Sequence, residues 1–131
     1  SNHTYASANN IVAAKKVKYE KEIGIFPDVK AVKSKGKWAI VKTNGKKITG
    51  FIYQDVKVEK LNDTYGTIAI AVKKNGKWGF VNELGKETVS PKFDEVKEIM
   101  FTGVKVKKDG KWGLVTIDGD GMMTLKSLTV L

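Results

Sequence analysis

The sequence of 131 residues contains no cysteine and no arginine, and it has only two prolines and one histidine. Without cysteine, disulfide bonds, thiol chemistry and zinc–thiolate sites are excluded. No apolar run reaches the roughly 20 residues of a membrane-spanning helix, so we expect no membrane span. The single histidine, His3, lies in the expected N-terminal tail, so no Ser–His–Asp arrangement is available, and no phosphate-binding glycine motif is present. We therefore expect no catalytic residue, no metal site and no cofactor.

Lysine alone supplies the basic excess that gives the chain a formal net charge of +10. Such an excess indicates anionic partners, for example nucleic acid, anionic lipid or an acidic polymer. Nucleic acid is less favoured, because bidentate phosphate and guanine recognition depends on arginine. Lysine also keeps exposed strand edges soluble, and this solvated-surface interpretation is the plainer one.

The length suits one domain that can bury a core without disulfides. Ser1-Asn2 resembles a cloning remnant, and we expect residues 1–10 to be a disordered tail before a single domain at 11–131. Ala6-Ser7-Ala8 resembles the small-residue end of a secretory signal, although no apolar stretch precedes it. On this basis we expect a secreted or cell-envelope protein.

Three tryptophans, Trp38, Trp78 and Trp112, stand in closely similar strings. The strings are KSKGKWAIV at 33–41, KKNGKWGFV at 73–81 and KKDGKWGLV at 107–115. Similarity that recurs at intervals of a few tens of residues indicates an array of one structural unit. We place the three units at about 26–60, 61–100 and 101–131.

Each string is typical of two strands joined by a two-residue turn, namely Lys35-Gly36, Asn75-Gly76 or Asp109-Gly110. Both faces of each hairpin are then partly apolar, so we expect sheets that are covered on both sides, with a lysine stem over each indole. The predicted cross-strand pairs are Lys33–Trp38, Val32–Ala39, Lys73–Trp78, Val72–Gly79, Lys107–Trp112 and Val106–Gly113.

Further elements complete the predicted fold. Period-two alternation within 16–25 predicts an additional N-terminal strand that pairs with the first unit. We assign a helical turn to 10–16, loops to 63–66 and 101–103, strands near 46–49, 52–58, 67–73, 86–89, 93–98 and 122–131, and Pro91 to a position between strands. The prediction is an all-β fold, an array of three hairpin-based units in twisted antiparallel sheets, with too few units for a closed propeller.

The core string, followed by Gly-Lys and then by P-x-F-D-E-V, resembles the WG repeats of bacterial proteins, also called KWG repeats. The second unit carries Lys77-Trp78-Gly79, Gly85-Lys86 and the whole of P-x-F-D-E-V at 91–96. The first unit has Ala39 in place of glycine, and the third lacks the P-x-F-D part. The resemblance implies β-rich modules, often in secreted or envelope proteins, with no settled biochemical activity and no catalytic residues.

The tryptophans allow two interpretations. They could be platforms for sugar rings or bases, beside lysines that contact anionic groups. They could instead be packing residues that hold each hairpin to its neighbour, and recurrence at one fixed site favours this role. We therefore predict a structural core that consists of Trp38, Trp78, Trp112, Gly79, Gly113, Ala39, Val72 and Val106.

The lysines at the hairpin ends form the second candidate. If the units stack in parallel, these ends meet in one basic ridge that would bind an anionic polymer weakly and in a salt-sensitive manner. A solvated face is the commoner role of such charge, and it is the alternative here. The candidate ligand-binding residues are Lys35, Lys37, Lys74, Lys77, Lys108 and Lys111.

Carboxylates form the third candidate. Acids recur after aromatic residues, Asp94 after Phe93 and Asp55 after Tyr53, and we interpret them as turn or cross-strand hydrogen-bond acceptors rather than general acids. Asp94 and Glu95 point to opposite faces of a strand and cannot act as an acid–base pair. Asp118-Gly119-Asp120-Gly121 is interpreted as a turn, because the bidentate glutamate of a calcium loop is absent.

We expect a non-enzymatic binding or interaction module of a secreted or cell-surface bacterial protein. Its lysine-rich face would contact an anionic cell-wall polymer or a protein partner. Two alternatives stay open: a purely structural spacer, and an accessory domain of a cell-wall-active enzyme whose catalytic part lies outside this sequence.

Overall fold

The computed structural model describes residues 17–25, 27–62, 67–100, 103–117 and 123–127. Three antiparallel sheets account for the strands: sheet A in the order β1-β2-β3, sheet B in the order β4-β5-β6-β7 and sheet C in the order β8-β9-β10-β11. The predicted all-β, antiparallel class is confirmed. The strands are β1 (Lys21–Ile25), β2 (Val29–Ser34), β3 (Lys37–Lys42), β4 (Asp55–Asn62), β5 (Thr67–Lys74), β6 (Lys77–Val81), β7 (Glu87–Phe93), β8 (Glu95–Met100), β9 (Gly103–Lys108), β10 (Lys111–Ile117) and β11 (Met123–Ser127).

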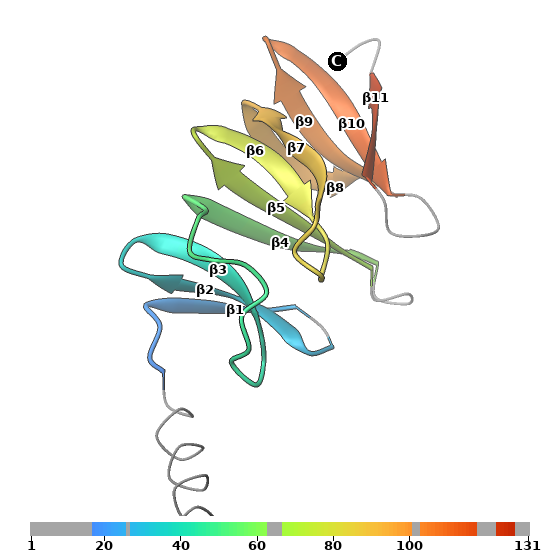
Figure 1. Cartoon of the computed structure of the whole chain (residues 1–131). Helices are drawn as coiled ribbons and strands as arrows, with labels where there is room; N and C mark the ends of the chain where they lie inside the picture. Colours follow the sequence, from blue (N-terminus) through green and yellow to red (C-terminus); the bar gives the residue numbers. More distant parts are fainter. Residues whose placement is uncertain (1–16, 26, 63–66, 101–102, 118–122, 128–131) are drawn as a thin grey trace, which may run out of the picture.

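The three sheets lie side by side in chain order, and each is a meander in which every strand pairs with the next (Figure 1). The hairpin tips β2–β3, β5–β6 and β9–β10 all point to the same side of this row (Figure 1). The sheets therefore stack in parallel, which is the condition given above for the hairpin ends to form one ridge. The expected tail at 1–10 lies outside the described residues, as do the predicted elements at 10–16, 63–66 and 118–121 and residues 128–131. The loop predicted at 101–103 is described only at Gly103, which begins β9.

The register predicted from the two-residue turns is confirmed in all three hairpins. Lys73 pairs with Trp78 and Val72 with Gly79 in sheet B, and the matching pairs form in sheets A and C. The first turn residue has a positive φ in each hairpin, 51° at Lys35, 52° at Asn75 and 51° at Asp109. Each is followed by a glycine at positive φ, which is the geometry of a type I′ turn.

Sheet B is covered on both faces, as the alternation of its apolar residues requires. One face packs Ile70, Val72 and Val81 against sheet A, which contributes Trp38 and Ile40 to the same cluster. The opposite face places Ala71, Trp78, Phe80 and Phe93 against Val96, Val104, Val106 and Val115 of sheet C. The core is therefore two interfaces between sheets, each built on one side of β5 and β6.

The outer face of sheet A is also closed. Val32, Ala39 and Val41 are buried there, and Tyr19 and Phe51 pack against them. The ring centroids of Tyr19 and Phe51 lie 6.4 Å from each other. No helix in the described part of the chain is long and apolar enough to cross a membrane. Sheets A and B are therefore covered on both faces, as predicted. For sheet C the prediction is wrong, because among the described residues a buried cluster covers only the face toward sheet B.

The N-terminal strand is confirmed as β1, which pairs with β2 along its full length. Two other predictions are wrong. Pro91 does not lie between strands, because the edge strand β7 runs through it. The register of β7 shifts between Val89, opposite Phe80, and Phe93, opposite Trp78, so Pro91 occupies an irregular stretch where a missing N–H breaks no regular ladder.

The second wrong prediction is a strand near 46–49. The chain there follows the free edge of β3 irregularly: Val41 makes an isolated bridge to Lys47, and the Ile40 carbonyl accepts the N–H groups of Ile48 and Thr49. A regular ladder cannot form where two successive N–H groups share one carbonyl. Sheet A consequently has three strands, where sheets B and C have four.

Candidate functional site

The same kind of side-chain hydrogen bond holds the hairpin tip in all three sheets. The residue before the first strand of each sheet accepts a hydrogen bond, through its side chain, from a backbone N–H of the turn. Glu20 accepts from Gly36 at 3.1 Å, Gln54 from Gly76 at 2.6 Å, and Asp94 from Asp109 at 2.9 Å. Turn N–H groups that would otherwise face water are thereby paired, and the tips are fixed relative to the sheets.

The backbone of the same three residues is anchored as well. The N–H groups of Glu20, Gln54 and Asp94 donate to the carbonyls of Lys33, Lys73 and Lys107, at 2.8, 2.7 and 2.8 Å. These are the lysines that face the three tryptophans. An aromatic residue precedes each acceptor, namely Tyr19, Tyr53 or Phe93.

The interpretation of Asp94 as a turn acceptor is confirmed by these contacts. The equivalent roles of Glu20 and Gln54 were missed from the sequence. Asp55, the acceptor expected after Tyr53, instead accepts the N–H of the adjacent Val56, and Gln54 takes the turn N–H of Gly76. One signal could have revealed all three acceptors. Tyr19-Glu20 is an aromatic residue followed by a polar acceptor, as are Tyr53-Gln54 and Phe93-Asp94, and each pair directly precedes a strand.

The six candidate lysines stand at the tips, and the side of the molecule that carries them is called here the hairpin edge (Figure 1). Lys35, Lys37, Lys108 and Lys111 are exposed and form no ion pair with any described carboxylate. Lys74 and Lys77 are different, because Lys74 lies 3.7 Å from Glu87 and Lys77 pairs with Asp94. Among the six candidate lysines, those without an ion pair to a described carboxylate therefore lie on the tips of sheets A and C.

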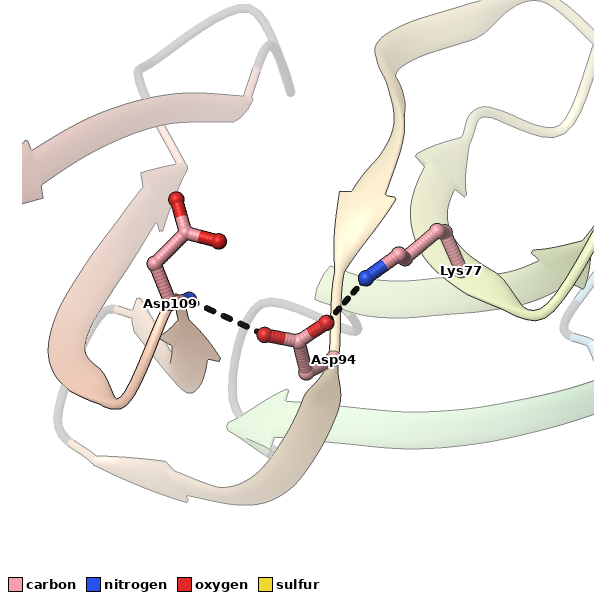
Figure 2. Close-up of polar contacts among 3 residues, drawn as sticks. All are labelled: Lys77, Asp94 and Asp109. Carbon is pink, nitrogen blue, oxygen red and sulfur yellow. Dashed lines mark hydrogen bonds and ion pairs between the residues drawn. The ribbon is translucent and has the colours of Figure 1, made fainter.

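Asp94 links two neighbouring tips. One carboxylate oxygen accepts from Lys77 Nζ of sheet B, and the other accepts the Asp109 N–H of sheet C (Figure 2). The hydrogen bond from Lys77, followed by that from the Asp109 backbone, lowers the pKa of Asp94. The same contact with Asp94 raises the pKa of Lys77. Both groups are therefore held in their charged forms at neutral pH.

The tryptophans are in two different environments. Trp38 and Trp78 are only 4% and 5% exposed, and each lies in an interface between sheets. Trp112 is half-buried, because it lies on the face of sheet C that is turned away from sheet B, so its prediction as a core residue is wrong. Of the other predicted core residues, Ala39, Val72, Gly79, Val106 and Gly113 are all buried.

Lysine ammonium groups lie over two of the indoles. Lys57 and Lys73 approach the Trp78 ring centroid to 5.0 and 5.9 Å. Three ammonium groups surround Trp112: Lys97 at 5.5 Å, Lys105 at 4.7 Å and Lys107 at 5.4 Å. Trp38 has no such contact with a described lysine. The predicted lysine-over-indole arrangement is confirmed in sheets B and C.

The glycine after Trp78 permits a close approach between strands. A Cβ atom at Gly79 would lie 2.6 Å from the Pro91 nitrogen and 2.6 Å from the Val89 carbonyl oxygen of β7. In sheet A, where β3 has no fourth strand beside it, the equivalent residue is Ala39. The need for glycine therefore comes from β7 and its irregular register.

The arrangement can bind anions by charge and can pack a ligand against one half-exposed indole. The described residues contain no group of three or more His, Asp or Glu side chains placed to hold a metal ion. Comparisons with protein-family models, with curated proteins and with solved structures find no significant match for this chain.

Proposed function

We propose that this chain is a non-enzymatic interaction module that binds an anionic polymer along the hairpin edge. One observation carries the proposal: Lys35, Lys37, Lys108 and Lys111 are exposed, lack ion-pair partners among the described residues, and stand on tips that point to one side. An ammonium that already has a carboxylate neighbour gains little from a second anion, whereas a free one gains a full contact.

The rigidity of the tips supports the proposal. Each turn is fixed by a side-chain acceptor, and each hairpin belongs to a sheet that packs against its neighbour. Lysines on fixed tips lose less freedom on binding than lysines on a flexible tail, so more of the electrostatic attraction remains as affinity. An extended polyanion that releases counterions at several tips would bind with a marked dependence on salt.

We infer further that the chain is an array of WG-type units and belongs to a secreted or cell-envelope protein. The three similar strings support the first part, together with the turn acceptors Glu20, Gln54 and Asp94, which recur at equivalent places. An anionic polymer of the cell surface is the partner that this location would offer.

The experiment compares two variants that lose the same charge. The triple variant K37Q/K108Q/K111Q removes three of the four lysine charges on the hairpin edge that lack an ion pair. It leaves the fourth, the turn residue Lys35, in place. The control K46Q/K47Q/K86Q neutralises three exposed lysines that lie outside the tips. Binding to immobilised polygalacturonate at low salt should weaken about tenfold or more in the edge variant. The control should change by less than about twofold.

Equal losses in the two variants would show that net charge alone attracts the polymer, and the proposal would then be wrong. Unchanged binding of the edge variant would contradict it as well. Neutral dextran, tested in parallel, should not bind any of the three proteins.

A further inference from the structure

The outer face of sheet C differs from the equivalent faces of sheets A and B. In those sheets the tryptophan face is buried by the next sheet, whereas the described residues place no sheet beyond the tryptophan face of sheet C (Figure 1). Trp112 and Leu114 are half-buried there, while Gly113 and Val115, which point to the other side, are buried. This face, defined by Trp112, Leu114, Lys97, Lys105 and Lys107, is called here the outer face of sheet C.

A register comparison with sheet B shows that this face is not shaped for another sheet. Ala71 pairs with Phe80 in sheet B, and the equivalent pair in sheet C is Lys105 with Leu114. Ala71 is 2% exposed in its interface. A docked sheet would therefore bury the ammonium of Lys105 without a partner, which is costly. A second copy of sheet C placed face to face would also bring two lysine clusters together.

The charges on this face are poorly balanced. Three ammonium groups lie within 5.5 Å of one ring centroid and so repel one another. Among the described carboxylates only Glu95 pairs with them, at 3.5 Å from Lys107. An anionic group placed among the three would relieve this repulsion and form charge-assisted hydrogen bonds.

We propose that the outer face of sheet C is a binding site for an anionic sugar residue. The sugar ring would lay its C–H face against the exposed part of the Trp112 indole, beside Leu114, and its charged group would contact Lys97, Lys105 and Lys107. A flat aromatic surface next to concentrated positive charge suits a ligand that carries a ring and an anion in one residue. A peptide of acidic residues supplies the charge but no ring for the indole.

This site is separate from the hairpin edge, and it extends the proposed function rather than depending on it. The edge has lysines without an aromatic residue and suits any extended polyanion. The outer face joins the two chemistries in one place and would select a sugar. The two proposals therefore predict different responses to the same set of variants.

The test is a titration with trigalacturonate, followed through the indole N–H signals of the three tryptophans in NMR spectra. W112F assigns the Trp112 signal. We expect a saturable shift of the Trp112 signal alone, since Trp38 and Trp78 are buried. K105A should weaken binding about fivefold, because one of three ammonium contacts is lost. Ala71 holds the equivalent position in sheet B, so this substitution should leave the fold intact.

Further ligands and variants decide the specificity. Neutral maltotriose, inorganic phosphate and hexaglutamate should each bind at least about fivefold more weakly than trigalacturonate. The edge variant K37Q/K108Q/K111Q should bind the trisaccharide like the wild type. An unmoved Trp112 signal or wild-type affinity in K105A would overturn the proposed site. Equal binding of phosphate or hexaglutamate would overturn the assignment of a sugar. Loss of trisaccharide binding in the edge variant alone would transfer the binding to the hairpin edge.

Discussion

Lys77, at the tip of sheet B, pairs with Asp94, the residue that precedes sheet C, and this pair joins two neighbouring tips (Figure 2). Asp94 completes the link by accepting the N–H of Asp109 at 2.9 Å. The tip of sheet A is not linked to that of sheet B in this way. Gln54 stands in the place of Asp94 and accepts the Gly76 N–H. Lys37, the equivalent of Lys77, has no described carboxylate partner.

The first prediction concerns the pH dependence of this link. Because the pKa of Asp94 is lowered in the folded state, its contribution to stability is present above its ordinary value of 3.8 and is lost as the pH falls through the lowered value. D94N should therefore have a lower Tm than the wild type at neutral pH, and the difference should shrink as the solution is acidified below about pH 4. Thermal unfolding at a series of pH values measures both.

E95Q is the matched control, since Glu95 is the next residue and pairs with Lys107 at 3.5 Å. Its Tm at neutral pH should fall less than that of D94N, because the link between the tips stays in place. A D94N variant whose Tm deficit stays constant down to pH 2 would contradict the assignment of the link to the charged carboxylate.

The second prediction concerns the close approach of β6 and β7. G79A should destabilise the fold by about 1–3 kcal/mol, because the added methyl group meets backbone atoms of Val89 and Pro91 that cannot move independently. G24A is the control: a Cβ atom at Gly24 has nothing within 4 Å and the position has no positive φ, so stability should change little. Urea unfolding of both variants checks this, and equal effects would show that the close contact is unimportant.

The third prediction compares two tryptophans in equivalent register positions. W78A should reduce the free energy of unfolding by about 3–5 kcal/mol, since the side chain is 5% exposed between two sheets. W112A should reduce it by only about 1–2 kcal/mol, because the indole is half-buried and no sheet among the described strands covers it. Denaturant unfolding measures the two losses. A loss in W112A as large as that in W78A would mean that Trp112 is a core residue.

The fourth prediction concerns Tyr53, which is buried beside Trp38. Burial, and then the charge and hydrogen bonding of Glu87, raise the pKa of Tyr53 above its ordinary value of 10.0. A raised folded pKa means that stability is lost as the pH rises beyond the ordinary value, because the unfolded chain ionises first. Y53F should therefore gain stability relative to the wild type above pH 10.

Spectrophotometric titration of the phenol groups gives an independent check. The wild type should show a tyrosine that ionises late, and this step should be missing in Y53F. Y19F serves as the control, since it removes a phenol from the outer face of sheet A. A late step that survives in Y53F and disappears in Y19F would refute the assignment.

Much of the fold could be read from local sequence signals. The pairs Asn75-Gly76 and Asp109-Gly110 fix the geometry of a two-residue turn, and this geometry fixes the register of the two strands. The register then places Lys73 opposite Trp78 and Lys107 opposite Trp112. The role of Asp94 as an acceptor followed from its position after an aromatic residue. These predictions succeeded because they depend on neighbours that lie within a few residues or directly across a two-residue turn.

The rest depends on contacts between sheets, which the repeat pattern does not encode. Trp78 and Trp112 stand in nearly the same string, yet Trp78 is buried and Trp112 half-buried, because no further sheet in the described part of the chain packs on sheet C. Lys77 has an ion-pair partner and Lys37 has none among the described residues, because the residue that precedes the next sheet is Asp94 in one case and Gln54 in the other. Pro91 can likewise lie within β7 because the register of that edge strand is irregular there, which the proline alone does not predict.

The most direct test of the proposed function is the salt dependence of polygalacturonate binding. The logarithm of the association constant should fall linearly with the logarithm of the salt concentration, with a slope set by the number of lysine contacts. The slope should become shallower by about two to three in K37Q/K108Q/K111Q and stay unchanged in K46Q/K47Q/K86Q. Identical slopes in all three proteins would contradict binding at the hairpin edge.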